Sequence, residues 1–321
     1  MQKLMRFLSG LLLMSSAVIH AQTGFPVKPI RVIVPVAPGG SVDTVTRVVA
    51  QRMSENVGQS VVLENRAGAS TNIGNELVAR APGDGYTLLA NTVPFVANVS
   101  LYSKLGYDPE KDFAPVSLLV SAPSLVVVHP SVPARNMREF VALAKKAPST
   151  IKYSTSGAGG ITHLSLELLA YQTAIKLVHV PYKGGGPALI ALMSGEVDVS
   201  FLPTVAVGSH ASSGRLRLLA VTSAQRLASM PAMPTVTESG VPGYVFSSWV
   251  GVLAPASTPA PIVKILNDHF VRAARSPDIV ERFAREGAEV VASSPEQFRR
   301  VIAEEVPQWA KVIKQAGIRA E

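Results

Sequence analysis

The sequence predicts an α/β protein made of two doubly wound domains that are joined by two crossing segments. Apolar, β-branched strands alternate with amphipathic helical stretches, and this alternation occurs in two separate series. Two long extended apolar segments, 115–130 and 246–255, stand where one series gives way to the other. The length of 321 residues fits two domains of roughly 150 residues each. Hydrophobic residues make up 47% of the chain, which is enough for a sizeable core.

The first series begins after Gly24 and predicts a parallel sheet. The run IRVIVPV (30–36) is continuously apolar and β-branched, which suits a strand buried on both faces. A helix is expected over 42–56, where apolar residues fall on one helical face and Gly58 marks the end. A strand at 60–64, a helix at 72–81 and a strand at 86–91 complete a βαβαβ series.

The second series shows the same alternation. The segment 115–130 that precedes it is expected to be broken at Pro123. Asn136 and Glu139 resemble a capping box for a helix that reaches Lys146. The further elements expected are strands at 151–155, 177–182, 197–201 and 215–222, and helices at 161–171, 187–194 and 204–212. A loop rich in Pro, Met, Ser and Gly follows at 223–243.

The C-terminal part returns the chain to the first domain. Helices are expected near 260–275 and 295–316, with a short strand at 288–293 between them. Because the chain crosses twice, we expect a discontinuous domain 1, and two such domains form a clamp with a cleft. The expected boundaries are 22–121 and 250–321 for domain 1, and 122–249 for domain 2.

The N-terminus predicts export. Lys3 and Arg6 form a short positive region, and residues 7–19 form an apolar run that is too short to span a membrane. Ala21 then offers a small residue for cleavage. We therefore expect a secretory signal peptide at 1–21, cleaved near Ala21. The alternative, a buried N-terminal helix, has no capping or amphipathic pattern in its favour.

The composition excludes several kinds of site and limits the kinds of partner expected for the chain. The chain has no Cys, which excludes disulfides, iron–sulfur clusters and Cys nucleophiles. It has 30 Lys and Arg against 22 Asp and Glu, and a basic balance suits nucleic acid, membrane surfaces or small acids. Because the chain is expected to be exported, we do not expect nucleic acid as a partner.

No motif of an enzyme or cofactor site stands out. The chain lacks a GxSxG elbow and a GxxxxGK[ST] loop, and its SxxK match at 149–152 enters a strand instead of a helix. His163 and Glu167 are spaced so that both can reach one metal ion, but a third ligand is not evident, and a capped helix start explains the pair more simply. We expect no catalytic residues, no metal and no cofactor. An exported α/β hydrolase acting on small esters or amides is the alternative.

The strands of both series tend to end in Gly, Ser, Thr or Asn just before a helix. Ligands of open parallel sheets bind at the carboxyl ends of the strands, where Gly-rich turns and helix N-termini present N–H groups to anions. Turn and cap formation explains any one such loop, but their repetition favours a site for a small carboxylate. Asp43 is expected to cap its own helix or brace its loop or, alternatively, to contact a substrate amine. The loops lie at 37–43, 68–72, 91–92, 154–163, 182–186 and 203–204.

At these residues the chain resembles the periplasmic solute-binding receptors of tripartite tricarboxylate transporters, the Bug proteins. Matching stretches include KPIRVIVPVAPGGSVDTVTR (28–47), VVLENRAGASTNIGNELVARAPGDGYTLL (61–89), YSTSGAGGITHLSLELL (153–169) and HVPYKGGGPALIALMSGEVDVSF (179–201). Their order and spacing agree over essentially the whole mature chain. The resemblance implies a fold like that of the type II periplasmic binding proteins, which closes on its ligand like a Venus flytrap.

The resemblance also implies a site and its partners. The ligand would be a small organic acid, delivered to integral-membrane transporter subunits or a sensor by a monomeric, periplasmic receptor. One domain would contribute Pro38, Gly39, Gly40, Ser41, Ala69, Ser70, Thr71 and Thr92, with Asp43 in support. The other would contribute Ser156, Gly157, Thr162 and His163, with Lys183 and Gly184 at the rim; Thr204 is added from the loop pattern.

Two departures from the family pattern bear on this expectation. The family commonly has Pro-Gly-Ala-Gly-Gly where this chain has Ala-Gly-Ala-Ser-Thr (67–71), so specificity is expected to differ at this loop. It often has Asp-Val before Pro-Thr where Ala232 and Met233 stand here, a change expected to be structural. A further alternative, the effector domain of a cytosolic regulator that responds to aromatic acids, would lack a signal peptide.

Overall fold

The computed structural model describes residues 24–204, 207 and 214–318. The predicted signal peptide and most of the predicted helix at 204–212 lie outside these residues. The strands are β1 (Ile30–Val34), β2 (Val61–Asn65), β3 (Thr87–Asn91), β4 (Phe113–Val128), β5 (Lys152–Thr155), β6 (Val178–Pro181), β7 (Val199–Pro203), β8 (Arg217–Val221), β9 (Ser247–Pro255) and β10 (Glu289–Val290). The helices are α2 (Ser41–Val57), η1 (Ala69–Thr71), α3 (Asn72–Ala79), α4 (Pro94–Leu101), α5 (Met137–Lys146), α6 (Ile161–Thr173), α7 (Gly185–Ser194), α9 (Ala260–Ala274), α10 (Pro277–Arg285) and α11 (Pro295–Ala316).

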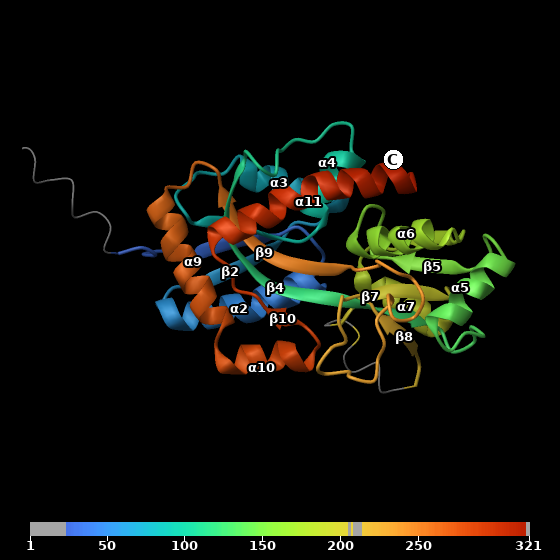
Figure 1. The fold of residues 1–321 in the computed structure, drawn as a ribbon. Helices are drawn as coiled ribbons and strands as arrows, with labels where there is room; N and C mark the ends of the chain where they lie inside the picture. The colour runs from blue at the N-terminus through green and yellow to red at the C-terminus, as the bar shows by residue number, and fades with distance from the viewer. Residues whose placement is uncertain (1–23, 205–206, 208–213, 319–321) are drawn as a thin grey trace, which may run out of the picture.

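The two predicted series form the two halves of one continuous, curled sheet (Figure 1). The strand order is β2-β1-β3-β9-β4-β7-β5-β6, with β8 and β10 also paired to β4. In the first half β1 is parallel to both β2 and β3, and in the second β5 is parallel to both β6 and β7. The parallel βαβ connections predicted for both series are therefore confirmed.

Strand β4 belongs to both halves. Its first part pairs antiparallel with β9 from Phe113 to Pro123, and its last part pairs with β7 from Ser124 onward. The expected break at Pro123 is wrong, because the strand continues through this residue. Pro123 stands where β4 changes its partner, and a missing N–H is tolerated at such an irregular point of a ladder.

The core of the first half lies on both faces of its sheet. On one face, valines of α2 pack with Leu266 and Phe270 of α9 and with Phe283 of α10. The opposite face is covered by α3, α4 and α11, which pack around Phe95 and Phe113. This arrangement leaves the carboxyl ends of β1, β2 and β3 free to carry loops.

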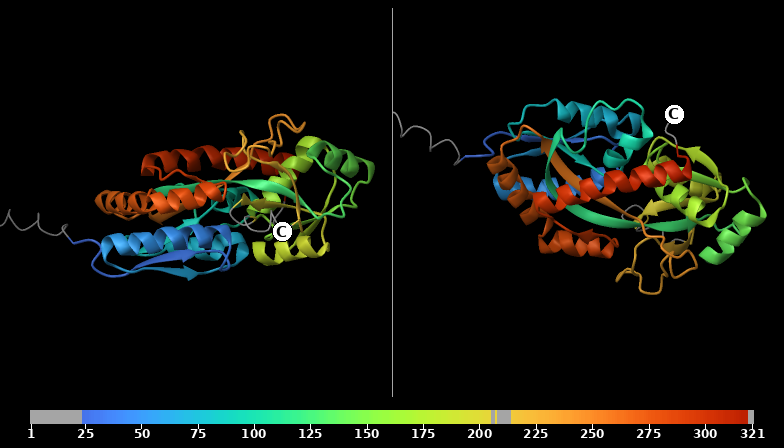
Figure 2. Two further views of the ribbon diagram at one scale, coloured as in Figure 1. Left: turned by 90° about the horizontal axis from the view of Figure 1, so that it is seen from below. Right: turned by 45° about the horizontal axis from the view of Figure 1, so that its top comes forward.

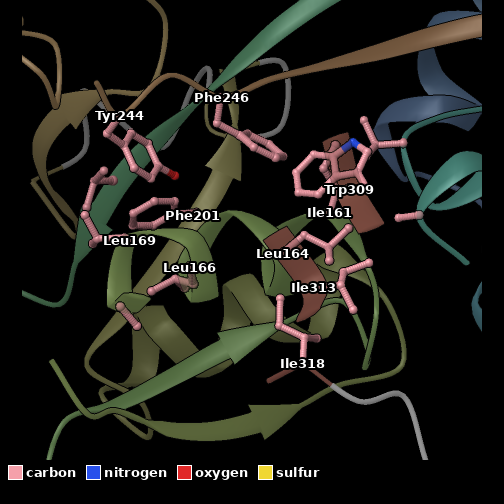
Figure 3. Packing of buried hydrophobic residues seen from close by; sticks show 14 of the residues in the cluster. Ile161, Leu164, Leu166, Leu169, Phe201, Tyr244, Phe246, Trp309, Ile313 and Ile318 are labelled. Carbon is pink, nitrogen blue, oxygen red and sulfur yellow. The ribbon is translucent and has the colours of Figure 1, made fainter. Parts of the chain in front are cut away.

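Helix α11 ties the two halves together. It runs along the molecule from the first half to α6 in the second (Figure 2). There Trp309 and Ile313 join a cluster with Ile161 and Leu164 of α6 (Figure 3). Trp309 also meets Phe246, just before β9, edge to face with ring centroids 5.8 Å apart. The apolar core is thus continuous between the halves.

Two helices are additional to the prediction. The first, α4, is short and almost wholly buried, so it has no amphipathic pattern. The second, α10, begins with proline and follows directly on α9, so the two helical patterns merge in the sequence. Within the described part of the chain, no helix has both the length and the apolar composition needed to cross a membrane.

Candidate ligand-binding site

The loops predicted to form a site approach one another from the two halves. Those after β1, β2 and β3 share one edge of the first half, because these three strands are parallel. A Cβ atom added to Gly184, in the loop after β6, would lie 4.0 Å from Cβ of Ala37, in the loop after β1. The structure therefore brings the loop after β1 next to the loop after β6.

Asp43 braces the first loop from below. Its side chain is 4% exposed, and its carboxylate accepts hydrogen bonds from the Gly39 N–H at 3.0 Å, Asn65 Nδ2 at 3.0 Å and Arg47 at 2.8 Å. Burial alone would raise the pKa of Asp43, but these hydrogen bonds hold it below its usual value. The bracing role is the one that the structure supports. Because the carboxylate oxygens already accept these hydrogen bonds, they are poorly available to a substrate amine.

The second loop has an unusual backbone. Ala69, Ser70 and Thr71 have φ angles of 45°, 48° and 81°, so three successive residues other than glycine lie in the left-handed region. Such a conformation costs energy for any L-residue with a side chain, most of all for β-branched Thr. Gly68, with φ of 145°, completes the turn.

Buried asparagines beneath this loop hold the turn in place. Asn98 of α4 donates both to the Ser70 carbonyl and to Asn72 Oδ1, each at 2.6 Å. Asn75 donates to the Thr71 hydroxyl at 3.2 Å. Four asparagines of this layer are buried, Asn72, Asn75, Asn91 and Asn98. Asn72 and Asn91 belong to the predicted loops, whereas the sequence pattern did not indicate Asn75 and Asn98, because Asn normally indicates turns.

The loop after β5 is predicted to form the facing part of the site. The Thr162 hydroxyl accepts from the Ser156 N–H at 2.9 Å and lies 3.2 Å from the Ser156 hydroxyl. Gly157 has a φ of 132°, a conformation that residues with a side chain rarely adopt. The Gly184 N–H donates to the Ser156 carbonyl at 3.2 Å, which joins this loop to the one after β6.

His163 lies beneath that loop. Its Nδ1 accepts from the Gly159 N–H at 3.0 Å, and its ring stacks on His179 with centroids 4.1 Å apart. Tyr153 also stacks with His179, with ring centroids 4.9 Å apart, and its ring centroid lies 6.3 Å from that of His163. Burial lowers the pKa of His163 and of His179 to about 4, so both rings are neutral at pH 7.

The spacing of His163 and Glu167 does not make a metal site. Glu167 accepts a hydrogen bond from the Tyr153 hydroxyl, and its carboxylate is 3.9 Å from His163 Nε2. Among the residues that the structure describes, no group of three or more His, Asp or Glu side chains is placed to hold a metal ion.

The remaining predicted residues differ in their surroundings. Lys183 is exposed, Thr92 is buried, and Pro38 and Gly39 are exposed on the first loop. Thr204 is 1% exposed, and its hydroxyl donates to the Gly287 carbonyl at 3.3 Å. Its side chain therefore connects the second half to the turn after α10 in the first half and does not reach the loop surface.

Comparisons with known proteins agree with this architecture. Residues 45–318 match the family model described as "Tripartite tricarboxylate transporter family receptor". Protein BugT of Bordetella pertussis is 37% identical over 306 residues, which cover 95% of this chain and 94% of BugT.

Solved structures are also similar. "R. palustris Rpa4515 with adipate" superposes with a TM-score of 0.88 at 36% identity, covering 92% of this chain and 99% of that one. MatC from Rhodopseudomonas palustris, solved with bound malate, gives a TM-score of 0.85 at 33% identity over 90% of this chain and all of MatC. The "periplasmic binding protein BugD" gives a TM-score of 0.87 at 35% identity, covering 92% of this chain and 99% of that one, so the hydrolase alternative gains no support. The chain belongs to the family of receptors of tripartite tricarboxylate transporters.

Proposed function

We propose that the chain binds one small organic acid between two lobes, residues 22–121 with 250–321 and residues 122–249. The observation that carries this proposal is the approach of the two sets of loops at Ala37 and Gly184. A ligand that touches both sets of loops favours the closed arrangement. A ligand shifts the equilibrium between the open and closed arrangements only when it binds one of them more tightly than the other.

The chemistry of the loops suits a carboxylate. The first turns of α2 and α6, which follow the turns at 38–41 and 156–160, contribute backbone N–H groups that have no intrahelical partner. The acidic group next to them, Asp43, is neutralised by Arg47 and by its hydrogen bonds. Relatives solved with adipate and malate support the same ligand class.

We propose the following roles for the residues of these loops. We assign Asp43 and His163 to positioning the loops, and Thr204 to the connection between the lobes. The residues proposed to meet the acid are Pro38, Gly39, Gly40, Ser41, Ala69, Ser70, Thr71, Thr92, Ser156, Gly157, Thr162, Lys183 and Gly184.

The family places the receptor within a transport system. We propose that the mature chain, cleaved near Ala21, works in the periplasm as a monomer and hands its ligand to integral-membrane transporter subunits. Size-exclusion chromatography with light scattering tests the monomer, and mass spectrometry of exported protein tests the cleavage.

Calorimetric titration tests the binding function. Succinate, malate, adipate and benzoate are each titrated into the protein, and saturable binding of at least one acid is expected. Gly40 is a suitable position for a variant that blocks the loop. Its φ is −72°, and a Cβ atom added to it would lie 3.6 Å from the Ala37 carbonyl oxygen, so a side chain fits there without backbone strain. The substitution Gly40→Phe should abolish binding while the ligand-free protein keeps its melting temperature. Unchanged affinity would refute the placement of the ligand at this loop.

A further inference from the structure

The turn Ala69–Thr71 keeps a glycine-type backbone without glycine. Its three φ angles lie between 45° and 81°. Glycine at any of these positions would relieve the strain, because it has no Cβ atom to clash with the neighbouring carbonyl. The two hydroxyl side chains of this turn, Ser70 and Thr71, can make hydrogen bonds that glycine cannot make.

The Thr71 hydroxyl has such an interaction inside the protein. Thr71 is 5% exposed, and its hydroxyl accepts from Asn75. Ser70 differs. Its carbonyl is held by Asn98 at 2.6 Å, but its hydroxyl makes no hydrogen bond to any part of the chain that the structure describes, and the residue is only half-buried. The backbone of Ser70 is fixed while its hydroxyl is available.

We infer that the Ser70 hydroxyl donates a hydrogen bond to the bound acid and that Ser70 is a specificity-determining residue of this receptor. The inference rests on the proposed function. Ser70 lies at the sheet edge that also carries the loops after β1 and β3, which the proposal places around the ligand. A hydroxyl adds a donor without adding charge, and a hydrogen bond to an ionised oxygen is among the stronger ones.

The substitution Ser70→Gly separates this role from a structural one. Glycine suits a φ of 48°, so the variant should melt about 2 °C higher than the wild type. It should also bind acid about tenfold more weakly, because a donor to a charged group is lost. Ser70→Ala removes the hydroxyl but keeps the strain, so it should lose the same affinity with a melting temperature close to that of the wild type.

Ser149 offers a matched control. Its φ is 59°, it is exposed, and it precedes β5 at the end opposite to the site loops. Ser149→Gly should raise the melting temperature as Ser70→Gly does and leave affinity unchanged. Each protein is titrated with succinate, malate, adipate and benzoate by calorimetry.

The outcomes distinguish the inference from the function on which it rests. Wild-type affinity in both Ser70 variants overturns the inference and leaves the receptor function intact. Weakened binding by Ser70→Gly but not by Ser70→Ala also overturns it, because loop flexibility and not the hydroxyl is then responsible. Equal weakening by Ser149→Gly does the same. If the wild type binds none of the four acids, the proposed function fails and the inference fails with it.

Discussion

Glu305 of α11 is predicted to destabilise the protein when it is ionised. Its two carboxylate oxygens accept from the Trp249 indole N–H at 3.0 and 2.9 Å. Burial raises the pKa of the Glu305 carboxyl to about 7, although the indoles of Trp249 and Trp309 act in the opposite direction. The folded protein therefore holds this proton at pH values where the unfolded chain, with a value of 4.5, has lost it.

The magnitude follows from linkage. Stability from this group is fully present below pH 4.5 and is lost as the pH rises through 7. The difference between the folded and unfolded pKa values of Glu305 lowers the free energy of unfolding by at most roughly 3 kcal/mol at pH 8 and by less than about 1 kcal/mol at pH 5. Glu305→Gln keeps an acceptor for the indole and removes the charge, so its stabilising effect should grow from pH 5 to pH 8.

Urea unfolding at pH 5, 6, 7 and 8 measures the effect. The matched control is Glu304→Gln, one residue earlier and exposed, which should change the free energy of unfolding by no more than about 0.5 kcal/mol at any pH. A Glu305→Gln effect that is the same at pH 5 and pH 8, or destabilising at both, would refute the reasoning.

Three further predictions concern the loops and the layer beneath them. Asn98→Leu should lower the free energy of unfolding by about 2 kcal/mol and weaken acid binding at least tenfold in calorimetry, because the buried carbonyl that Asn98 holds loses its donor. Gly157→Ala should cost about 1–3 kcal/mol in urea unfolding, since its φ is 132°, whereas Gly40→Ala with its φ of −72° should cost less than 1 kcal/mol. The pKa of His163 is lowered to about 4, so its stabilising effect is complete above pH 6.5 and is lost as the pH falls toward 4. His163→Gln should therefore flatten the acid side of the stability profile by up to about 3 kcal/mol, and an unchanged profile would contradict this.

The sequence predicts local structure well where one pattern decides it. The helix with an apolar face over 42–56 is α2, and Gly58 ends it in the left-handed conformation with a φ of 68°. The cap at Asn136 is also confirmed, since its side chain accepts from the Glu139 N–H at 2.9 Å. In each case a few neighbouring residues determine the outcome, so no knowledge of tertiary contacts is needed.

The layer beneath the candidate site could not be predicted in this way. Tyr153, His163 and His179 stack together although they come from β5, α6 and β6. Nothing in the spacing of these residues along the chain indicates the stack. The left-handed turn at Ser70 was equally hidden, because Ser carries no signal for a positive φ and the turn depends on Asn98, 28 residues later.

The ring stack and the left-handed turn at Ser70 could not be predicted for the same physical reason. A receptor that binds through backbone N–H groups needs those groups held in fixed directions, and only buried side chains from other elements can hold them. Asn98 does this for the loop after β2, Asp43 for the loop after β1, and His163 for the loop after β5. All three side chains are buried, and each forms a hydrogen bond to a backbone group of its loop. Changes in ligand preference can therefore arise in this layer without altering any residue that touches the ligand, and the loop residues alone are an incomplete guide to what such a receptor binds.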